Sequence, residues 1–382
     1  MQDSIDNMNF DVIVLGSRDF KNSPYGISGL ETHCEKMFGC FESAGSEFNI
    51  LMVHCSRSSG GITISNKSKN YSSINIKGSS IKVCDKLFYS LRSISLIINL
   101  RPKLVHMQGF SVIWIAPVLR LFKIPIITTI HSREYNNPGK GWVVRLIARL
   151  AKTLTSIFSE IIVISQSAQK EFLGARFIPN GMDLPIINDS DRLWRNKKLE
   201  ELQIKHSYIV CLGRVVGEKG IDILIQELAE SKIYMPVIII GAHDEKSSYK
   251  KELMGKISSD YADHVHFLGP LAHSTCMAFL EGSALYISAS MLEECPIAPR
   301  EAMALNIPMV LSDIEAHRNI LLPNDCYYEF GSFGCLAEKI RKVLSGDFCN
   351  TVELSDPQSW TDCAKSTMDV YDEVLDKKLD RL

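Results

Sequence analysis

The stretch Tyr208–Ile225, YIVCLGRVVGEKGIDILI, joins an apolar run to a helical pattern through a loop rich in glycine and charge. It predicts a strand, a tight turn and a helix that opens near Gly220. The same succession recurs from one end of the chain to the other. Further strands are expected at Phe10–Leu15, Phe48–His54, Leu104–Met107, Ile124–Ile130, Glu160–Ile164, Arg176–Ile178, Pro236–Ile240, His264–Leu268, Ala284–Ser288 and Met309–Leu311, and helices from about Leu30 and at 220–230, 246–259, 273–281 and 298–305.

This alternation is typical of parallel sheets covered by helices on both faces, and it is interrupted once. The polar, turn-rich segment 180–196 predicts a linker. A chain of 382 residues can bury two cores. We therefore expect an α/β protein with two Rossmann-like domains, 1–184 and 197–358, joined by a linker at 185–196 and facing each other across a cleft. An apolar stripe in 359–382 predicts a C-terminal helix that returns to the first domain.

Charge and cysteine content limit the class of protein. Residues 1–184 hold 21 Lys and Arg against 13 Asp and Glu, whereas the remainder holds 21 against 31. A basic half favours an anionic surface or substrate, with solvated charge as an equal alternative. Eleven cysteines without a C-x-x-C pattern indicate a reduced, cytoplasmic protein. No signal peptide is expected, and the longest apolar tract, Phe110–Leu119, is shorter than the ~18 residues of a membrane span.

The segment Lys140–Phe158 places Arg145, Arg149 and Lys152 at helical spacing beside Trp142 in an otherwise apolar helix. Such a basic amphipathic helix can lie on an anionic membrane surface at the inner face of the membrane. The favoured interpretation is a helix packed on the core with an exposed basic edge.

Two cations flank the turn of the opening stretch. Arg214 offers a planar fork and Lys219 a point charge, at a helix N-terminus that also attracts anions. This arrangement suits a diphosphate, and a capped helix with solvated charges is the alternative. Ser28 and Gly29 end another glycine-rich loop before a helix, a second place where backbone N–H groups can meet an anion.

Two acids stand in the stretch Met291–Pro308, MLEECPIAPREAMALNIP. Glu293 precedes a turn at Cys295-Pro296 and Glu301 lies in the helix that follows, so both could face one ligand. Each carboxylate can hold a diol, and a solvated pair of acids is the alternative. A diphosphate site together with two diol-binding acids indicates a nucleotide-sugar.

His131 ends the β-branched run Ile124–Ile130. A lone histidine at a strand end is more often structural, but opposite a diphosphate it could bond a reacting hydroxyl or steady developing charge. Gly16-Ser17-Arg18 does not continue as G-x-G-x-x-G, which argues against a dehydrogenase. No DxD-type metal cluster is evident at the end of a predicted strand, since the one D-S-D triplet, Asp189–Asp191, lies in the linker. Neither a metal nor another cofactor is therefore expected, and no nucleic-acid partner is indicated.

Five segments in order resemble the retaining glycosyltransferases of family 4, which have the GT-B fold and include bacterial surface-polysaccharide enzymes. They are VLGSRDFKNSPYGISGLETHCEKM (14–37), IIVISQSAQKEF with FIPNGMDL (161–184), CLGRVVGEKGIDILI (211–225), HVHFLGPL (264–271) and the E-x7-E stretch that runs into MALNIPMVLSDI (293–314). The resemblance is collinear over nearly the whole chain.

The resemblance implies a role for each candidate residue around a nucleoside diphosphate-sugar donor. Arg214 and Lys219 would hold the diphosphate. Glu301 would bind the ribose hydroxyls, Glu293 would bind a hydroxyl of the transferred sugar, and His131 would lie near the anomeric centre. Gly29 would belong to a loop over the donor, and the donor site would be completed by Gly269, Leu271 and Ile297, with the base near Gly269–Leu271.

The implied activity is transfer of a hexosyl group, with retention, to an acceptor hydroxyl, for which a lipid-linked glycan in polysaccharide biosynthesis is the expected partner. Two departures leave the donor sugar open: Ser28-Gly29 replaces the usual Gly-Gly, and Glu294–Arg300 replaces a small, glycine-containing stretch. A nucleotide-sugar epimerase or phosphorylase on the same fold, and a non-catalytic partner subunit, are the alternatives.

Overall fold

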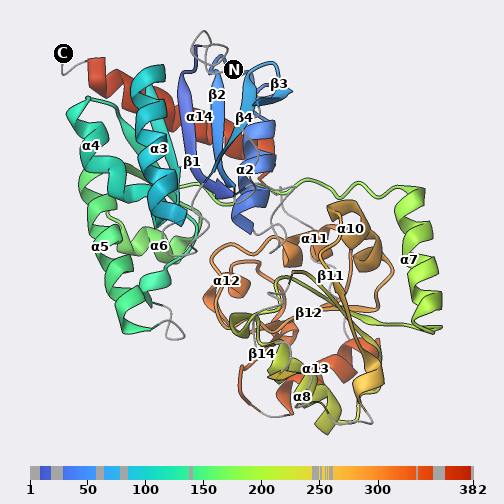
Figure 1. The fold of residues 1–382 in the computed structure, drawn as a ribbon. Coiled ribbons are helices and arrows are strands. Elements are labelled where there is room, and N and C mark those ends of the chain that lie inside the picture. The colour runs from blue at the N-terminus through green and yellow to red at the C-terminus, as the bar shows by residue number, and fades with distance from the viewer. Residues whose placement is uncertain are drawn as a thin grey trace. The chain divides into compact units, whose positions relative to one another are not determined.

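The structure is a computed structural model that describes residues 9–18, 29–56, 64–77, 85–136, 141–242, 249, 252–253, 255, 257, 261–332, 334–346 and 358–379. The chain divides into two compact units. The first contains β1, the segment Gly29–Gly181 and the C-terminal segment from Gln358, and the second begins at Met182. Figure 1 shows that each unit is built around its own sheet.

The sheet of the first unit has the strand order β3-β4-β2-β1-β5-β6-β7-β8 among the described residues. Every neighbouring pair is parallel except β3 and β4, which are antiparallel. The strands are β1 Val12–Arg18, β2 Ile50–Ser56, β3 Ile64–Ser68, β4 Tyr71–Lys77, β5 Leu104–Gln108, β6 Ile126–Ile130, β7 Glu160–Val163 and β8 Arg176–Phe177. The central strands are buried along their whole length, as expected for a sheet covered on both faces.

The helices of the first unit are α2 Gly29–Gly39, α3 Asp85–Leu100, η1 Phe110–Ile115, α4 Ala116–Leu121, η2 Glu134–Asn136, α5 Trp142–Phe158, α6 Gln166–Glu171 and α14 Trp360–Leu379. The C-terminal helix α14 packs against α2 and the sheet, which confirms the expected return. Tyr371 Oη lies 2.7 Å from Nδ1 of His106 on β5. Gly181 makes a close approach possible, because a Cβ there would lie 2.5 Å from the Trp360 backbone.

One face of α5 packs on the core. Ala148, Ala151 and Thr155 are buried, and Leu154 and Phe158 pack against the apolar cluster of the first sheet. The favoured interpretation, a helix packed on the core, is therefore confirmed for this face. The opposite face is apolar as well as basic, which was not expected: Trp142 is 72% exposed.

The sheet of the second unit has the order β11-β10-β9-β12-β13-β14, all parallel, among the described residues. Its strands are β9 Ile209–Leu212, β10 Val237–Ile240, β11 Val265–Gly269, β12 Leu285–Ser288, β13 Met309–Ser312 and β14 Tyr327–Tyr328. Its helices are α7 Asp189–Glu201, η3 Gly217–Lys219, α8 Ile221–Glu230, η4 Ala262–His264, α10 His273–Glu281, α11 Ala298–Ala304, α12 Glu315–Arg318, η5 Asn324–Cys326 and α13 Cys335–Leu344.

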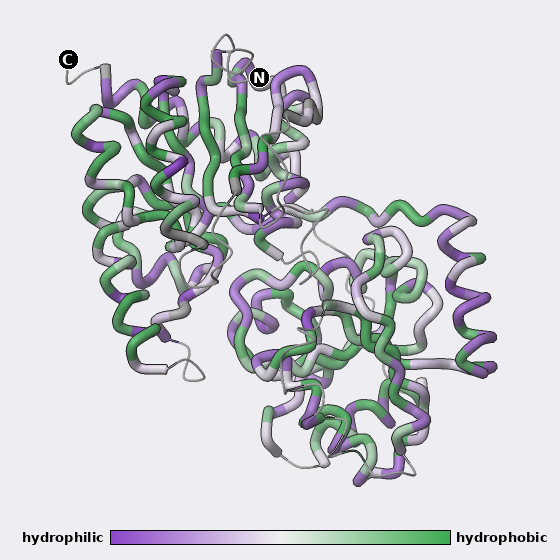
Figure 2. The backbone as a smooth tube through the Cα atoms, viewed as in Figure 1, coloured by the Kyte–Doolittle hydropathy of each residue, from purple (hydrophilic) through white to green (hydrophobic). Residues whose placement is uncertain are grey.

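The predicted linker at 185–196 is not irregular throughout, because α7 begins at Asp189. The helix is mostly hydrophilic, as Figure 2 shows, so its sequence lacks the apolar stripe that marks a packed helix. Polar contacts with α10 add to the packing of Trp194 on Phe279. Arg192 donates to both carboxylate oxygens of Glu281 at 2.8 and 2.9 Å, and Thr275 donates to Asp191 at 2.7 Å.

Two parallel α/β units confirm the expected fold class. The strands that the sequence predicts all appear, with ends shifted by a few residues. The edge strands β3 and β14 and the strand β4 beside β3 were not predicted, since their polar or very short sequences lack the continuous apolar pattern of a central strand. The helix expected at 246–259 lies largely outside the described residues.

Candidate functional site

A close approach of two loops builds the core of the candidate site in the second unit. Gly220, between η3 and α8, has a φ of 61°, and a Cβ there would lie 2.1 Å from the Ala289 carbonyl oxygen. Glycine alone permits both the left-handed conformation and this contact. The Met291 amide donates to the Glu218 carbonyl at 2.9 Å. The turn carrying Lys219 therefore lies directly against the segment that follows β12.

Glu293 and Lys219 form an ion pair at this contact. The Glu293 carboxylate also accepts a hydrogen bond from Ser290 Oγ at 2.9 Å. Burial alone would raise the pKa of Glu293, but the charge and hydrogen bond of Lys219 lower it below the ordinary value. Glu293 is thus ionised at neutral pH, and it neutralises a lysine whose side chain is itself mostly buried.

A small pocket opens at the carboxyl ends of β9 and β12. Its lining includes Gly213, Arg214, Lys219, Ser288 and Ser290. Arg214 is half exposed, and its Nη2 lies 3.0 Å from Glu218 Oε1. The sequence therefore correctly placed both cations at the end of one strand, and the structure adds two serine hydroxyls from the neighbouring strand.

Glu301 has a different partner. Its carboxylate is buried in α11 and lies 2.6 Å from Nε2 of His273, the first residue of α10. The segment of Gly269 and Leu271 leads from β11 into that helix. The Glu301 amide donates to the Ile297 carbonyl at 3.0 Å. The two acids of the E-x7-E stretch thus face separate groups, one cationic turn and one histidine.

His317 was not predicted and lies fully buried beside this site. Its Nδ1–H donates to the Ser312 carbonyl at 2.8 Å, and its Nε2 lies 3.3 Å from Ser288 Oγ. Burial lowers its pKa, although the nearby Glu293 acts to raise it. Because this contact joins the ends of β12 and β13, no local pattern could have revealed it.

A line of hydrogen bonds holds His131 in the first unit. His131 Nε2 lies 2.7 Å from Gln108 Oε1, and Gln108 Nε2 lies 3.2 Å from Nε2 of His106. Since Gln108 donates through its nitrogen, His106 Nε2 accepts, and His106 Nδ1–H donates to Tyr371. This assignment makes His131 Nε2 a donor. Burial keeps the pKa of His131 well below its ordinary value, so the ring is neutral.

His33, on the helix that begins at Gly29, packs against His131. The two ring centroids are 4.7 Å apart in an edge-on arrangement. His33 Nδ1 lies 2.9 Å from Asn180 Oδ1, while its Nε2 is buried and has no hydrogen-bond partner among the described residues. The structure thus joins the predicted Gly29 helix to His131. Ser28 lies outside the described residues.

The neutral histidines predict acid sensitivity. Burial lowers the pKa of His33 to about 4 and that of His106 to about 3. Below pH 6.5 these two histidines bind protons in the unfolded chain but stay neutral in the folded chain. The free energy of unfolding should therefore fall as pH drops from 6.5 toward 4. Near pH 5 these two groups together should contribute about 2.7 kcal/mol per pH unit to the slope, and His131, whose pKa burial also lowers, adds to it.

Urea unfolding between pH 7 and 4.5 measures this slope. His33→Gln should reduce it by about 1.4 kcal/mol per pH unit, the contribution of one group, whereas substitution of the exposed His206 should leave it unchanged. An equal slope in wild type and His33→Gln would contradict the assignment of His33 as a buried neutral ring.

The candidate residues fall in both units. Gly29 and His131 belong to the first, and Arg214, Lys219, Gly269, Leu271, Glu293, Ile297 and Glu301 belong to the second. Within the described part of the chain, no group of three or more His, Cys, Asp or Glu is arranged to hold a metal ion.

Two family models match the chain in succession. The model described as Glycosyltransferase Family 4 matches residues 27–185, and that described as Glycosyl transferases group 1 matches residues 194–359. The chain is 26% identical over 242 residues to an uncharacterized glycosyltransferase of Haemophilus influenzae, covering 60% of this chain. It is 23% identical over 279 residues to a phosphatidyl-myo-inositol mannosyltransferase of Mycobacterium leprae, covering 67% of this chain. The matches span 65% and 69% of those relatives' own lengths.

Solved structures share the fold over nearly the full chain. Sucrose-phosphate synthase of Thermosynechococcus elongatus has a TM-score of 0.73 at 16% identity, covering 97% of this chain and 98% of that one. Anabaena Alr3699/HepE in complex with UDP and glucose has a TM-score of 0.74 at 17% identity, covering 95% and 100%.

Proposed function

The chain belongs to the family 4 glycosyltransferases with the GT-B fold, and on that premise we propose that it moves a sugar, with retention, from a nucleoside diphosphate donor to an acceptor hydroxyl. The observation that carries the proposal is the Lys219–Glu293 pair, whose lysine lines the pocket at the ends of β9 and β12. One cation beside one ionised acid suits a ligand that presents a phosphate next to a sugar hydroxyl. The similar Anabaena protein was solved with UDP and glucose, which supports this ligand class.

Each residue has a distinct proposed role. Arg214 and Lys219 bind the diphosphate and stabilise its charge as it leaves, a preorganised electrostatic contribution. Glu293 binds a hydroxyl of the transferred sugar and orients it. Glu301 binds the ribose, with the base near Gly269–Leu271 and with Ile297 at the start of the same helix. The two cations supply the charge that the leaving group needs, so the proposal invokes no metal.

The first unit would contribute the acceptor side of the reaction. Neutral His131 donates through Nε2 and has Nδ1 as its remaining acceptor, so it can steady a hydroxyl near the anomeric centre. Gly29 begins the helix that holds His33 against His131. No protein nucleophile is required in this scheme.

Product analysis tests the activity. Radiolabelled nucleotide-sugars are incubated with the protein, with and without a glycan acceptor. Label in a longer glycan that keeps the anomeric configuration supports the proposal. Conversion of the donor sugar without an acceptor indicates an epimerase, and release of a sugar phosphate indicates a phosphorylase. Donor binding in a thermal-shift screen without turnover indicates a non-catalytic subunit.

The two acids should differ when each is replaced by glutamine. Glu301→Gln should weaken binding of bare nucleoside diphosphate about tenfold or more, because it removes charge-assisted bonds to the ribose. Glu293→Gln should lower transfer without weakening the binding of bare nucleotide, because the carboxylate binds the sugar and its loss leaves Lys219 free for the diphosphate. Calorimetry with the nucleoside diphosphate measures both, and equal weakening by the two variants would contradict the division of roles.

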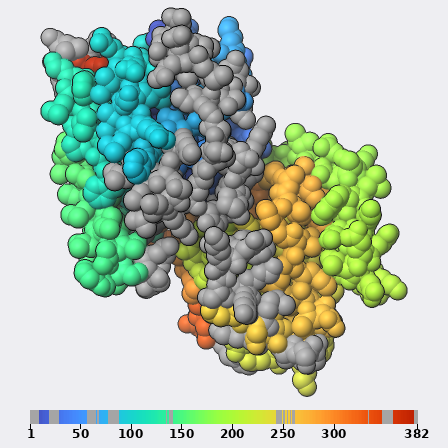
Figure 3. All heavy atoms as spheres, in the orientation of Figure 1, coloured from blue at the N-terminus to red at the C-terminus, as the bar shows by residue number. Residues whose placement is uncertain are grey.

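We also propose that the acceptor is a lipid-linked glycan and that the first unit lies on an anionic membrane surface. Figure 3 shows 85–123 and 141–158, cyan to green, at the surface of this unit. Beyond Trp142, exposed apolar side chains include Leu121 at 82% and Ile157 at 62%. Such a concentration of large apolar side chains marks an interaction surface. In the described part of the chain, no helix is both long and apolar enough to cross a membrane.

Charge favours lipid over another protein as the occupant of this surface. The segments 110–123 and 141–158 contain Arg and Lys but no Asp or Glu. Arg120, Lys123 and Arg149 are exposed among the apolar side chains. Arg145 Nε is buried and has no hydrogen-bond partner in the part of the chain that the structure describes. Apolar side chains interleaved with cations are typical of helices that lie in an anionic interface.

A further inference from the structure

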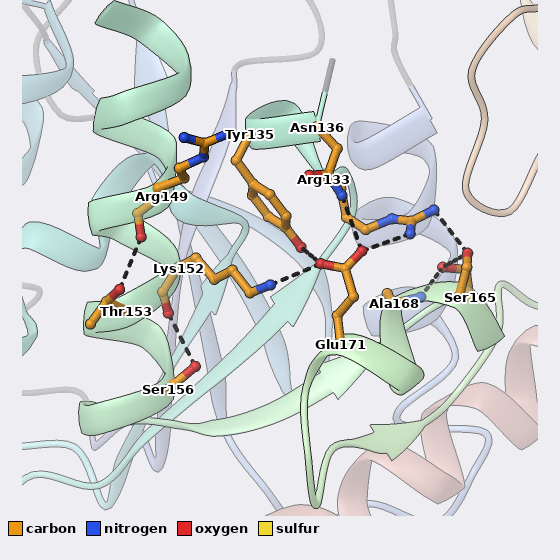
Figure 4. Close-up of polar contacts among 11 residues, drawn as sticks. Arg133, Tyr135, Asn136, Arg149, Lys152, Thr153, Ser156, Ser165, Ala168 and Glu171 are labelled. Carbon is orange, nitrogen blue, oxygen red and sulfur yellow. Dashed lines mark hydrogen bonds and ion pairs between the residues drawn. The ribbon is translucent and has the colours of Figure 1, made fainter. Parts of the chain in front are cut away.

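Glu171, the last residue of α6, accepts hydrogen bonds from four side chains. Tyr135 Oη lies 2.9 Å from one carboxylate oxygen and Lys152 Nζ 2.8 Å from the same one. Arg133 Nη1 and Asn136 Nδ2 reach the other oxygen at 2.9 and 3.1 Å. Figure 4 shows the carboxylate at the point where these side chains converge. No sequence pattern singled out this residue.

The four donors come from two different parts of the first unit. Arg133, Tyr135 and Asn136 belong to the short segment that directly follows His131 and ends in η2. Lys152 comes from α5, the helix with the exposed apolar side. The sequence placed Lys152 with Arg145 and Arg149 on a basic face of this helix, but its ammonium bonds to Glu171 instead. Its Nζ also lies 4.5 Å from the centre of the Tyr135 ring. Glu171 therefore joins the His131 segment to α5.

The donors around Glu171 stabilise its ionised carboxylate. Burial would raise the pKa of Glu171, but hydrogen bonds from Lys152, Arg133 and Tyr135 lower it to about 2. The carboxylate is therefore ionised at neutral pH. It forms ion pairs with both Arg133 and Lys152. Arg133 has a second contact, 2.9 Å to Ser167 Oγ on α6.

We propose that Glu171 is a positioning residue for His131, and that through Lys152 it ties that position to α5. His131 is held on one side by Gln108 and on the other continues into the segment that Glu171 anchors. The inference rests on the proposed function for the meaning of His131 in catalysis, but the position of the ring can be observed without any reaction.

The first experiment observes that position directly. The ring carbons of histidine are labelled with ¹³C, and the His131 signal is assigned by its loss in His131→Ala. In Glu171→Gln the His131 signal should shift while the His317 signal of the second unit stays in place. Lys152→Met should shift it as well, by less, because only one of the four donors is removed.

Glu373→Gln is the matched control. Glu373 also pairs with an arginine of the first unit, Arg176, but both side chains are about half exposed. This variant should leave the His131 signal unchanged. An unchanged His131 signal in folded Glu171→Gln would overturn the proposal, and an unchanged signal in Lys152→Met would overturn the link to α5. Tyr135→Phe, which keeps the ring and removes one hydroxyl, gives a second test if Glu171→Gln does not fold.

The second experiment uses transfer kinetics. Glu171→Gln should lower kcat about tenfold with the donor KM within twofold, and Glu171→Asp should restore part of the loss. If Glu171 acts through His131, the double variant Glu171→Gln/His131→Ala should be no slower than His131→Ala alone. Losses that multiply would overturn the proposal. Absence of transfer with every donor would instead contradict the proposed function, while the ring signals would still decide the role of Glu171.

Discussion

Lys219→Ala is expected to lower kcat/KM for the nucleotide-sugar by roughly 10- to 150-fold, the equivalent of one charge-assisted contact of about 1.5–3 kcal/mol. The structure gives a reason to expect the upper part of that range. Lys219 neutralises Glu293, whose carboxylate is mostly buried. Without the lysine, that carboxylate would stay in the pocket and repel a diphosphate.

Calorimetry with the nucleoside diphosphate, which lacks the sugar, should show weaker binding by Lys219→Ala. The double variant Lys219→Ala/Glu293→Gln should recover part of this affinity, because the repelling charge is gone. Lys198→Ala is the matched control, since Lys198 pairs with Glu201 on the surface of α7 in the same unit. An unchanged Kd for the nucleoside diphosphate in Lys219→Ala would refute the diphosphate assignment.

Reversing the charges on the apolar surface of the first unit should abolish binding to anionic vesicles. The variant Arg120→Glu/Lys123→Glu/Arg149→Glu removes three contributions of about 1 kcal/mol each and adds three repulsive ones. Even the first effect alone corresponds to roughly 150-fold in affinity. Lys152 is left unchanged, because its ammonium is bonded to Glu171 rather than exposed.

Vesicle flotation compares anionic with neutral lipid at low and high salt, since salt should weaken the binding. The control variant Lys170→Glu/Lys365→Glu/Lys377→Glu changes the net charge equally at exposed positions outside α4 and α5. It should float more than the first variant. Failure of the wild type to float with anionic vesicles at low salt would remove the support for a membrane-bound acceptor.

The sequence determined the layered α/β architecture and the positions of its candidate binding groups. Continuous β-branched runs such as Ile124–Ile130 can only be buried strands, and parallel strands bring their carboxyl ends to one edge. For that reason Arg214 and Lys219 could be placed after a strand without any structure. The sequence also predicted that the last helix, α14, returns to the first unit, because its apolar stripe has to be buried against another surface.

Tertiary structure alone decided which group each side chain meets. Glu293 pairs with Lys219 and Glu301 with His273, although both acids belong to one short stretch. The sequence also did not show which face of α5 is exposed, because the spacing of its apolar and small residues is compatible with either a core or a surface position. Glu171 is the clearest case, since its four donors stand 19 to 38 residues away along the chain. The local sequence pattern indicates which residues are buried and whether a segment is a helix or a strand. Hydrogen-bond and ion-pair partners instead depend on which loops the sheets bring together.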